Sequence, residues 1–131
     1  MKNIIFTLIA AFFFVTACEK EGNSDLKVQK EEELKMMYEN IQESVDTVVC
    51  NDASQWSITS LGQDKYGAVK EYIAYPHSID TANFLNMVKT YTEAEKEYHE
   101  KYNPTTTVVL SSPGPVDVEC ISGKATLIYE D

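Results

Sequence analysis

Apolar residues recur at a helical period in two segments of the chain, and the first lies between residues 26 and 49. Neither Gly nor Pro interrupts this segment, so a helix is predicted over 26–49. We expect it to pack on its own domain, although the same stripe is compatible with a short coiled-coil seam. The positions that form the stripe are Leu34, Met37 or Tyr38, Ile41, Val45 and Val48.

The second helical segment runs from Ser78 to Tyr102 and carries its own start and stop signals. Asp80 is a suitable N-cap, and Ile79 before it can contact Phe84 inside the helix. The pair Asn103-Pro104 ends the pattern, because proline cannot continue a helix. Acidic side chains are expected mostly on solvent faces. The apolar stripe consists of Phe84, Val88, Tyr91, Tyr98 and Tyr102.

The other apolar residues alternate with polar ones or lie in β-branched runs, which predicts strands. In the first strand Trp56 and Leu61 belong to opposite faces, and Ser122-Gly123 is the turn between the last two strands. The expected fold is α+β, a small antiparallel sheet of about four or five strands with the second helix packed on it and the first as an additional N-terminal helix. The predicted strands cover 55–61, 69–75, 105–110, 116–121 and 125–129.

The N-terminal segment differs from everything that follows it. Residues 4–15 are apolar except for Thr7, and Lys2 precedes them. A basic start and a short apolar centre are typical of a secretory signal, and the apolar run is too short to span a bilayer. The end of the run, from Val15 to Cys18, resembles bacterial lipoprotein signals, in which the cysteine is lipidated and becomes the first residue. An ordinary signal peptide with an incidental Cys18 is the alternative.

These boundaries divide the chain into a signal peptide over 1–17, a lipidated cysteine with a flexible tether over 18–25, the helix over 26–49 and a disulfide-closed α+β domain over 50–131. The expected location is the cell envelope, lipid-anchored in the outer membrane of a Gram-negative bacterium, on its periplasmic or surface face. Eleven basic and 21 acidic residues give a formal net charge of −10. A nucleic-acid partner is excluded because phosphate backbones bind basic surfaces, and membrane attachment is left to the acyl chains.

Three cysteines are present, and Cys18 is assigned to the lipid. Cys50 and Cys120 remain as an even pair in an oxidising compartment, which favours a disulfide. Such a bond would close a loop of about 70 residues and stabilise the domain by about 4 kcal/mol. Two free thiols or a shared metal ion are the alternatives, but no CxxC or HxxxH motif accompanies the pair.

A spaced pattern of residues runs through the second half of the chain: Cys50, Trp56, Tyr72-Ile73-Ala74-Tyr75, Ser78-Ile79-Asp80 and Cys120. This pattern resembles a family of small exported bacterial proteins without an assigned activity. In that family a Cys-Gly-Gly-Pro sequence usually precedes the Tyr-Ile-x-Tyr strand, and another cysteine follows the main helix. Here the first site reads Tyr66-Gly67-Ala68-Val69, and no cysteine lies between Asn103 and Pro113. Because both members of that second pair are missing together, the resemblance supports pairing of the remaining two cysteines.

Residues suited to catalysis or metal binding are sparse, and His77 and His99 are the only imidazoles. His77 adjoins Ser78, and neighbours in sequence cannot form the nucleophile–base pair of a hydrolase. Glu95 and His99 lie one helical turn apart and could ligate a metal, but without a second His or Cys a surface ion pair is the simpler interpretation. No catalytic residue, metal or cofactor is therefore expected.

Tyrosine is in excess, with eight residues, and exposed tyrosines suit contact with proteins or glycans. The leading hypothesis is a lipid-anchored, non-catalytic binding or interaction module whose partner is an envelope protein or a glycan. One alternative is an inhibitor or immunity-type protein that acts on a secreted enzyme through a rigid proline loop, and another is a small envelope hydrolase that uses Glu95 or His99. The candidate binding surface comprises Tyr66, Tyr72, Tyr75, Pro113 and Pro115.

Overall fold

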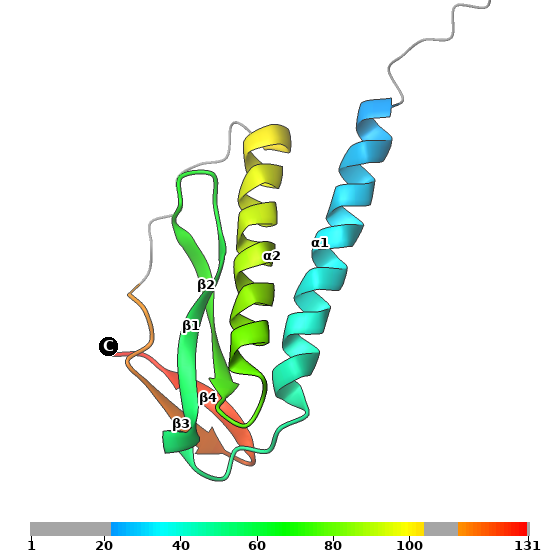
Figure 1. Ribbon diagram of the computed structural model, residues 1–131. Helices are drawn as coiled ribbons and strands as arrows, with labels where there is room; N and C mark the ends of the chain where they lie inside the picture. Colours follow the sequence, from blue (N-terminus) through cyan, green and yellow to red (C-terminus); the bar gives the residue numbers. More distant parts are fainter. Residues whose placement is uncertain (1–21, 104–112, 131) are drawn as a thin grey trace, which may run out of the picture.

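The chain folds into an α+β structure of two helices and two antiparallel β-hairpins (Figure 1). The computed structural model describes residues 22–103 and 113–130. A short 3-10 turn, Ala53–Gln55, precedes the first strand. The main elements are α1 (Gly22–Asp46), β1 (Trp56–Gln63), β2 (Val69–Pro76), α2 (Thr81–Tyr102), β3 (Asp117–Ile121) and β4 (Lys124–Ile128).

The described strands form two separate two-stranded sheets, so the prediction of one sheet of about four or five strands is not confirmed. β1 pairs with β2 and β3 pairs with β4, whereas β3 and β4 pack on the first hairpin without pairing with its edges. The second hairpin covers a face of the first one because β1–β2 carries apolar residues on both faces and both faces must be buried. The strand expected over 105–110 lies outside the described residues.

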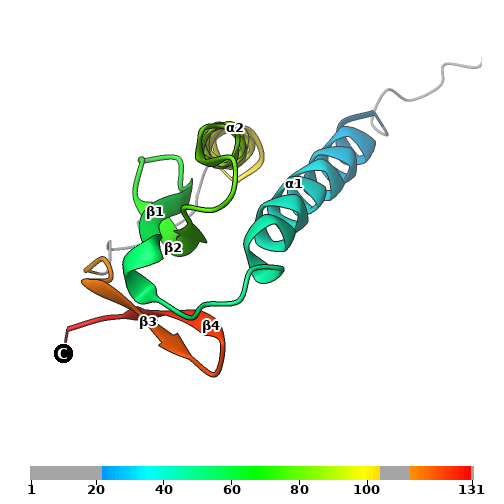
Figure 2. The same ribbon diagram turned by 60° about the horizontal axis from the view of Figure 1, so that its bottom comes forward.

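Three layers result, with the β1–β2 hairpin in the middle, α2 on one side and the β3–β4 hairpin on the other (Figure 2). Successive side chains of a strand point to opposite faces, as the prediction for the first strand assumed. Leu61 and Ile73 belong to the α2 face and form one buried cluster with Phe84 and Val88. Trp56 and Ala74 belong to the opposite face.

The helix α2 follows its sequence signals closely. The Asp80 side chain accepts a hydrogen bond from the Asn83 amide at 3.0 Å, which caps the helix start. At the other end Asn103 is the C-cap, and its amide donates to the His99 carbonyl. The predicted stripe is buried at Phe84 and along the helix to Tyr98. The helix therefore begins at Thr81, as the N-cap predicts.

The helix α1 is shifted relative to its prediction and spans Gly22–Asp46 rather than 26–49. Its first residues, 22–25, were expected in the flexible tether, but they are helical, and the Asp25 carboxylate in the first turn interacts favourably with the helix dipole. The helix ends early because the run Thr47-Val48-Val49 is β-branched. Ile41 is fully buried in the core. Neither described helix is long and apolar enough to cross a membrane.

The β3–β4 hairpin is fastened to the connection between α1 and β1. Ser122 and Gly123 have φ angles of 52° and 79°, the left-handed conformation that a two-residue hairpin turn requires. Cys50 and Cys120 form the predicted disulfide, with their Cα atoms 5.3 Å apart. The Cys50 amide also donates to the Gly123 carbonyl at 2.8 Å. The outer layer is thus held by a covalent bond as well as by packing.

We predict that replacing both disulfide cysteines, in the double variant Cys50→Ser/Cys120→Ser, lowers the free energy of unfolding by about 4 kcal/mol. The physical reason is that the bond closes a 70-residue loop and so restricts the unfolded chain. Urea unfolding followed by Trp56 fluorescence measures the change. A reductant should reproduce the loss in the unmodified chain and leave the double variant unaffected. Equal unfolding midpoints for the two proteins would contradict a stabilising role.

Candidate functional site

A cavity of about 450 Å³ lies between the end of α1, the strand β2 and the β3–β4 turn. This volume is within the range of small-ligand pockets, which is about 300–1,000 Å³. Two aromatic side chains and several polar ones line it, a combination typical of ligand sites. We call it the Trp56 groove, and its side chains include Gln42, Asp46, Trp56, Tyr72, Lys124 and Leu127.

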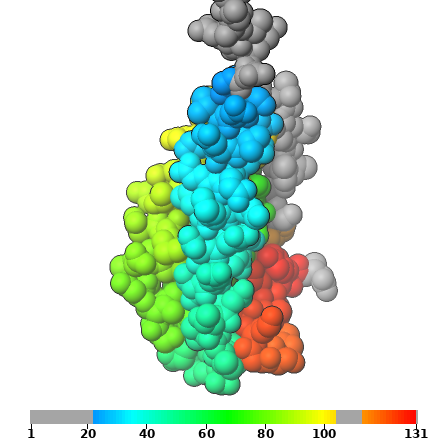
Figure 3. Space-filling model, turned by 90° about the vertical axis from the view of Figure 1, so that its right-hand side faces the viewer, coloured from blue at the N-terminus to red at the C-terminus, as the bar shows by residue number. Residues whose placement is uncertain are grey.

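The groove exists because three segments converge without filling the space between them. From the side of α1, the helix lies in front, with α2 on one side and the β3–β4 hairpin on the other (Figure 3). Asp46 is the last residue of α1, and Lys124 is the first of β4. Neither side chain forms an ion pair within the described part of the chain, so one carboxylate and one ammonium group are available at the groove.

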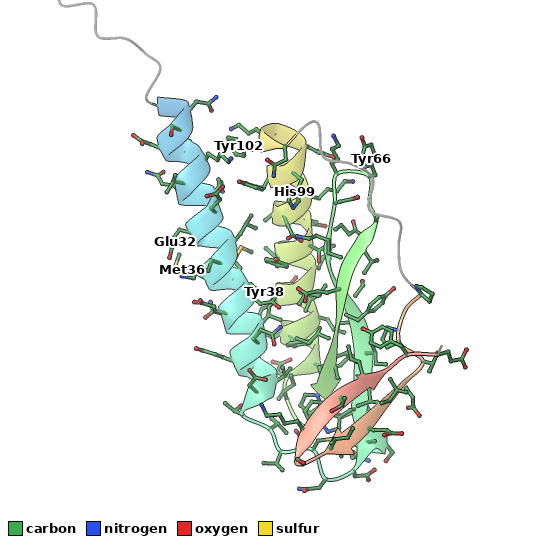
Figure 4. All side chains as sticks on the ribbon, turned by 180° about the vertical axis from the view of Figure 1, so that it is seen from behind. Glu32, Met36, Tyr38, Tyr66, His99 and Tyr102 are labelled. Atoms are coloured by element: carbon green, nitrogen blue, oxygen red, sulfur yellow. A yellow bond between two sulfur atoms is a disulfide. The ribbon has the colours of Figure 1, made fainter. Side chains whose placement is uncertain are left out.

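The three predicted tyrosines do not form one surface. Tyr72 lines the groove, whereas Tyr75 belongs to the α2 face and packs against Phe84 with ring centroids 5.2 Å apart. Tyr66 lies at the tip of the β1–β2 hairpin, where it is 61% exposed and the Lys65 ammonium stands 4.9 Å from its ring centroid (Figure 4). The candidate surface therefore separates into a groove residue, a core residue and a tip residue.

The proline loop contacts one residue of the groove lining, Tyr72. Pro113 is exposed and Pro115 is half-buried. Between them, a Cβ added at Gly114 would lie 3.0 Å from the Tyr72 hydroxyl oxygen, so Gly114 packs directly on that ring. Trp56 was assigned to a strand face by its position but not to a binding site. The signal that could have identified Trp56 was the alternation of the strand. Trp56 and Leu61 point to opposite faces, and α2 covers only the Leu61 face.

A second polar group of residues surrounds Glu95, which is only 5% exposed. The expectation that acidic side chains face solvent is wrong here. Glu95 Oε1 accepts hydrogen bonds from the Lys70 ammonium and from the Tyr91 hydroxyl at 3.2 Å, and His99 Nε2 lies 3.8 Å away. A buried carboxylate is tolerated only with such partners, so this cluster fixes α2 against β2.

The second oxygen of Glu95 faces the backbone of β1. Among the described residues Oε2 has no hydrogen-bond partner, and it lies against Gly62, whose φ is 77°. The Gly62 amide also donates to Thr92 Oγ1 at 3.0 Å. The strand β1 itself continues through Gly62 to Gln63, beyond the predicted end at Leu61.

Burial and negative charge raise the pKa values of three neighbouring groups. Burial, followed by the charge of Glu95, raises the pKa of the Tyr91 hydroxyl well above its usual range. Burial also raises the pKa of Glu71, and the 3.3 Å hydrogen bond from Tyr38 opposes that increase. Tyr38 reaches this position from α1, between the two helices (Figure 4). Burial, followed by the charge of Glu71, also raises the pKa of Tyr38, so both tyrosines are neutral hydrogen-bond donors at physiological pH.

Neither histidine belongs to a cluster of three metal-ligating side chains in the described residues. His99 contacts Glu95 and the Asn103 side-chain nitrogen, and no three His, Cys, Asp or Glu side chains gather there as metal ligands would. His77, which directly follows β2, has its Nε2 2.7 Å from Ser57 Oγ on β1, a contact that the sequence did not predict. Within the described residues no carboxylate bonds the other ring nitrogen, so Ser57 and His77 form a pair and not a Ser-His-Asp triad.

We predict that Gly62→Ala destabilises the fold more than Gly67→Ala does. Both glycines have positive φ, so each alanine costs about 1 kcal/mol in backbone conformation. Only the Gly62 substitution also places a Cβ against Glu95, which adds about 1–3 kcal/mol. Chemical unfolding of the two variants measures the difference. Equal losses would show that the Glu95 side chain moves aside at no cost.

The Trp56 groove, the Glu95 cluster and the Ser57–His77 pair are three site-like features of the described residues. Of these, the groove has both volume and a mixed aromatic and polar lining. The Glu95 cluster is buried, and the Ser57–His77 pair is only a hydrogen-bonded dyad. No family model, curated protein or solved structure matches this chain.

Proposed function

We propose that this chain is a lipid-anchored protein of the bacterial cell envelope whose folded part is a non-catalytic module that binds a ligand in the Trp56 groove. The observation that carries this proposal is the groove itself, with Trp56 and Tyr72 beside one charge of each sign that has no ion-pair partner among the described residues. Aromatic rings give a ligand contact area at low entropic cost, and a few polar groups fix its orientation. An envelope protein or a glycan offers surfaces of this kind.

The proposed anchor rests on the N-terminal sequence. A basic start, an apolar centre and the small residues before Cys18 are what a lipoprotein signal requires. Two or more acyl chains anchor a protein stably, and a net charge of −10 gives no electrostatic attraction to anionic lipid. The outer membrane of a Gram-negative bacterium is the proposed location, and the resemblance to small exported proteins agrees with it.

The helix α1 supports this arrangement by its length and polarity. A helix of 25 residues is about 38 Å long. Its first half is exposed and carries ion pairs such as Lys30–Glu33, while Glu32 and Met36 lie on its outer side (Figure 4). The groove is formed at the far end of α1, around Asp46. A lipid at Cys18 would therefore leave the groove away from the bilayer.

Protein inhibition is a second candidate, since the proline loop packs on Tyr72, a residue of the groove lining. The contact of Gly114 with Tyr72 joins the loop to the groove wall. A bound protein could touch Pro113 and the groove at the same time. The two functions differ in the partner rather than in the surface used.

We predict that Cys18 carries the membrane anchor. Metabolic labelling with an alkyne-bearing fatty acid should mark the unmodified protein, which should sediment with membranes. The variant Cys18→Ser should be unlabelled and appear in the soluble fraction, because one polar side chain then replaces the acyl chains. Cys50→Ser/Cys120→Ser is the matched control and should stay labelled. Membrane sedimentation of unlabelled Cys18→Ser would contradict lipid anchoring.

We predict that ligand binding changes the fluorescence of Trp56, the single tryptophan of the chain. Peptidoglycan fragments and short peptides are the first probes, added to the mature chain with Cys18→Ser. Tyr72→Ala should weaken binding by about tenfold or more, because a central aromatic contact is lost. Tyr66→Ala is the control and should bind normally, since Tyr66 lies outside the groove. Loss of binding in Tyr66→Ala alone would place the site at the hairpin tip instead.

A further inference from the structure

The Trp56 groove runs along the edge of β2 that no other described strand pairs with. Its lining includes three consecutive residues, Tyr72, Ile73 and Ala74. Because successive side chains point to opposite faces of a sheet, three neighbours border one cavity only where the cavity meets the strand edge. In the described part of the chain β2 pairs with β1 alone. The groove is therefore bounded by main chain as well as by side chains.

The register shows which main-chain groups point into this groove. The His77 amide donates to the Gln55 carbonyl at 2.8 Å, so this pair faces β1. In an antiparallel ladder the direction alternates, and residues at odd positions of β2 bond to β1. The N–H and C=O groups of Tyr72 and Ala74 point the other way. No described residue forms a backbone hydrogen bond with them on that side.

We propose that an extended, basic peptide segment of a partner protein binds in the Trp56 groove by adding a strand to the open edge of β2. This inference rests on the proposed function and specifies its ligand. An added strand would pair with the free groups of Tyr72 and Ala74 at the ordinary strand spacing of about 4.8 Å. Its side chains would lie among the groove residues, which include Trp56 and Asp46.

The charge of the chain selects among the possible occupants. Asp46 and Lys124 nearly balance each other at the groove, whereas the whole chain carries −10. A long-range field of this sign attracts a basic segment and raises its association rate. It also opposes edge-to-edge pairing of two copies, since both would carry the same excess charge. The end of α1 and the β3–β4 turn further limit the added strand to a few residues.

The direct experiment uses the mature chain with Cys18→Ser and its disulfide intact. The probe is a short capped peptide of alternating Lys, Val and Thr. One matched peptide carries N-methyl groups on its central residues, and another has Glu in place of Lys. Trp56 fluorescence reports binding, and hydrogen exchange measured by NMR reports the amides of Tyr72 and Ala74. We expect the basic peptide to bind and to protect both amides, and the other two peptides to bind at least about tenfold more weakly.

Two proline variants separate the two edges of the β1–β2 hairpin. Ala74→Pro removes an N–H that points into the groove, without removing a bond to β1. Binding of the basic peptide should weaken by about tenfold. Ser60→Pro is the control, because Ser60 lies opposite Tyr72 and its N–H points to the far edge of β1. Unfolding of both variants checks their folding, and Ala125→Phe fills the groove from β4 if Ala74→Pro does not fold.

The outcomes divide the possibilities. Equal binding of the N-methylated peptide, or equal binding to Ala74→Pro, overturns strand addition. If the chain without peptide sediments as a dimer and the amides of Tyr72 and Ala74 are already protected, a second copy is the occupant. This result also overturns binding of a partner peptide. If the basic peptide fails while peptidoglycan fragments still change Trp56 fluorescence, the inference is wrong and the proposed function stands. If neither class of probe has an effect, both are wrong.

Discussion

A two-stranded hairpin that is apolar on both faces is the constraint on which this structure depends. Such a hairpin is not stable alone in water, because it cannot bury either face. Leu61 and Ile73 require α2 on one side, while Trp56 and Ala74 require a cover on the other. The β3–β4 hairpin provides that cover, and the disulfide holds it there. The covalent bond is therefore part of how the core is closed, rather than an addition to a finished domain.

The edge of β2 that has no partner among the described strands follows from the same arrangement. α1 contributes Ile41 and Val45 to the core, but its last turn passes beside β2 instead of pairing with it. Proteins usually protect such edges, because unpaired main-chain groups invite other strands. Here the flanking helix, the hairpin turn and the negative charge of the chain restrict what can approach. The arrangement that would admit a proposed partner strand thus also limits edge-to-edge aggregation.

Much of the fold could be predicted because its signals are local. The limits of α2 are set by two local hydrogen bonds. The Asp80 side chain accepts one from the Asn83 amide, and the Asn103 amide donates one to the His99 carbonyl. The turn at Gly123 needs a left-handed residue, which the sequence supplies. The disulfide followed from counting cysteines rather than from geometry. The single sheet was not confirmed, because periodicity identifies a strand but not its neighbour.

The sequence by itself determined the helices, the hairpin turn, the cysteine pair and the acidity, each of which depends on composition or on residues a few positions apart. Only the tertiary structure decided which side chains share a site. Tyr72 and Tyr75 look equivalent in sequence, but one lines a groove and the other packs in the core. The sequence predicts a surface position for Glu95, but its side chain is buried. It can be buried because the ammonium group of Lys70, far away in the chain, donates a hydrogen bond to it. Burial and pairing depend on contacts between distant segments, and no local pattern encodes them.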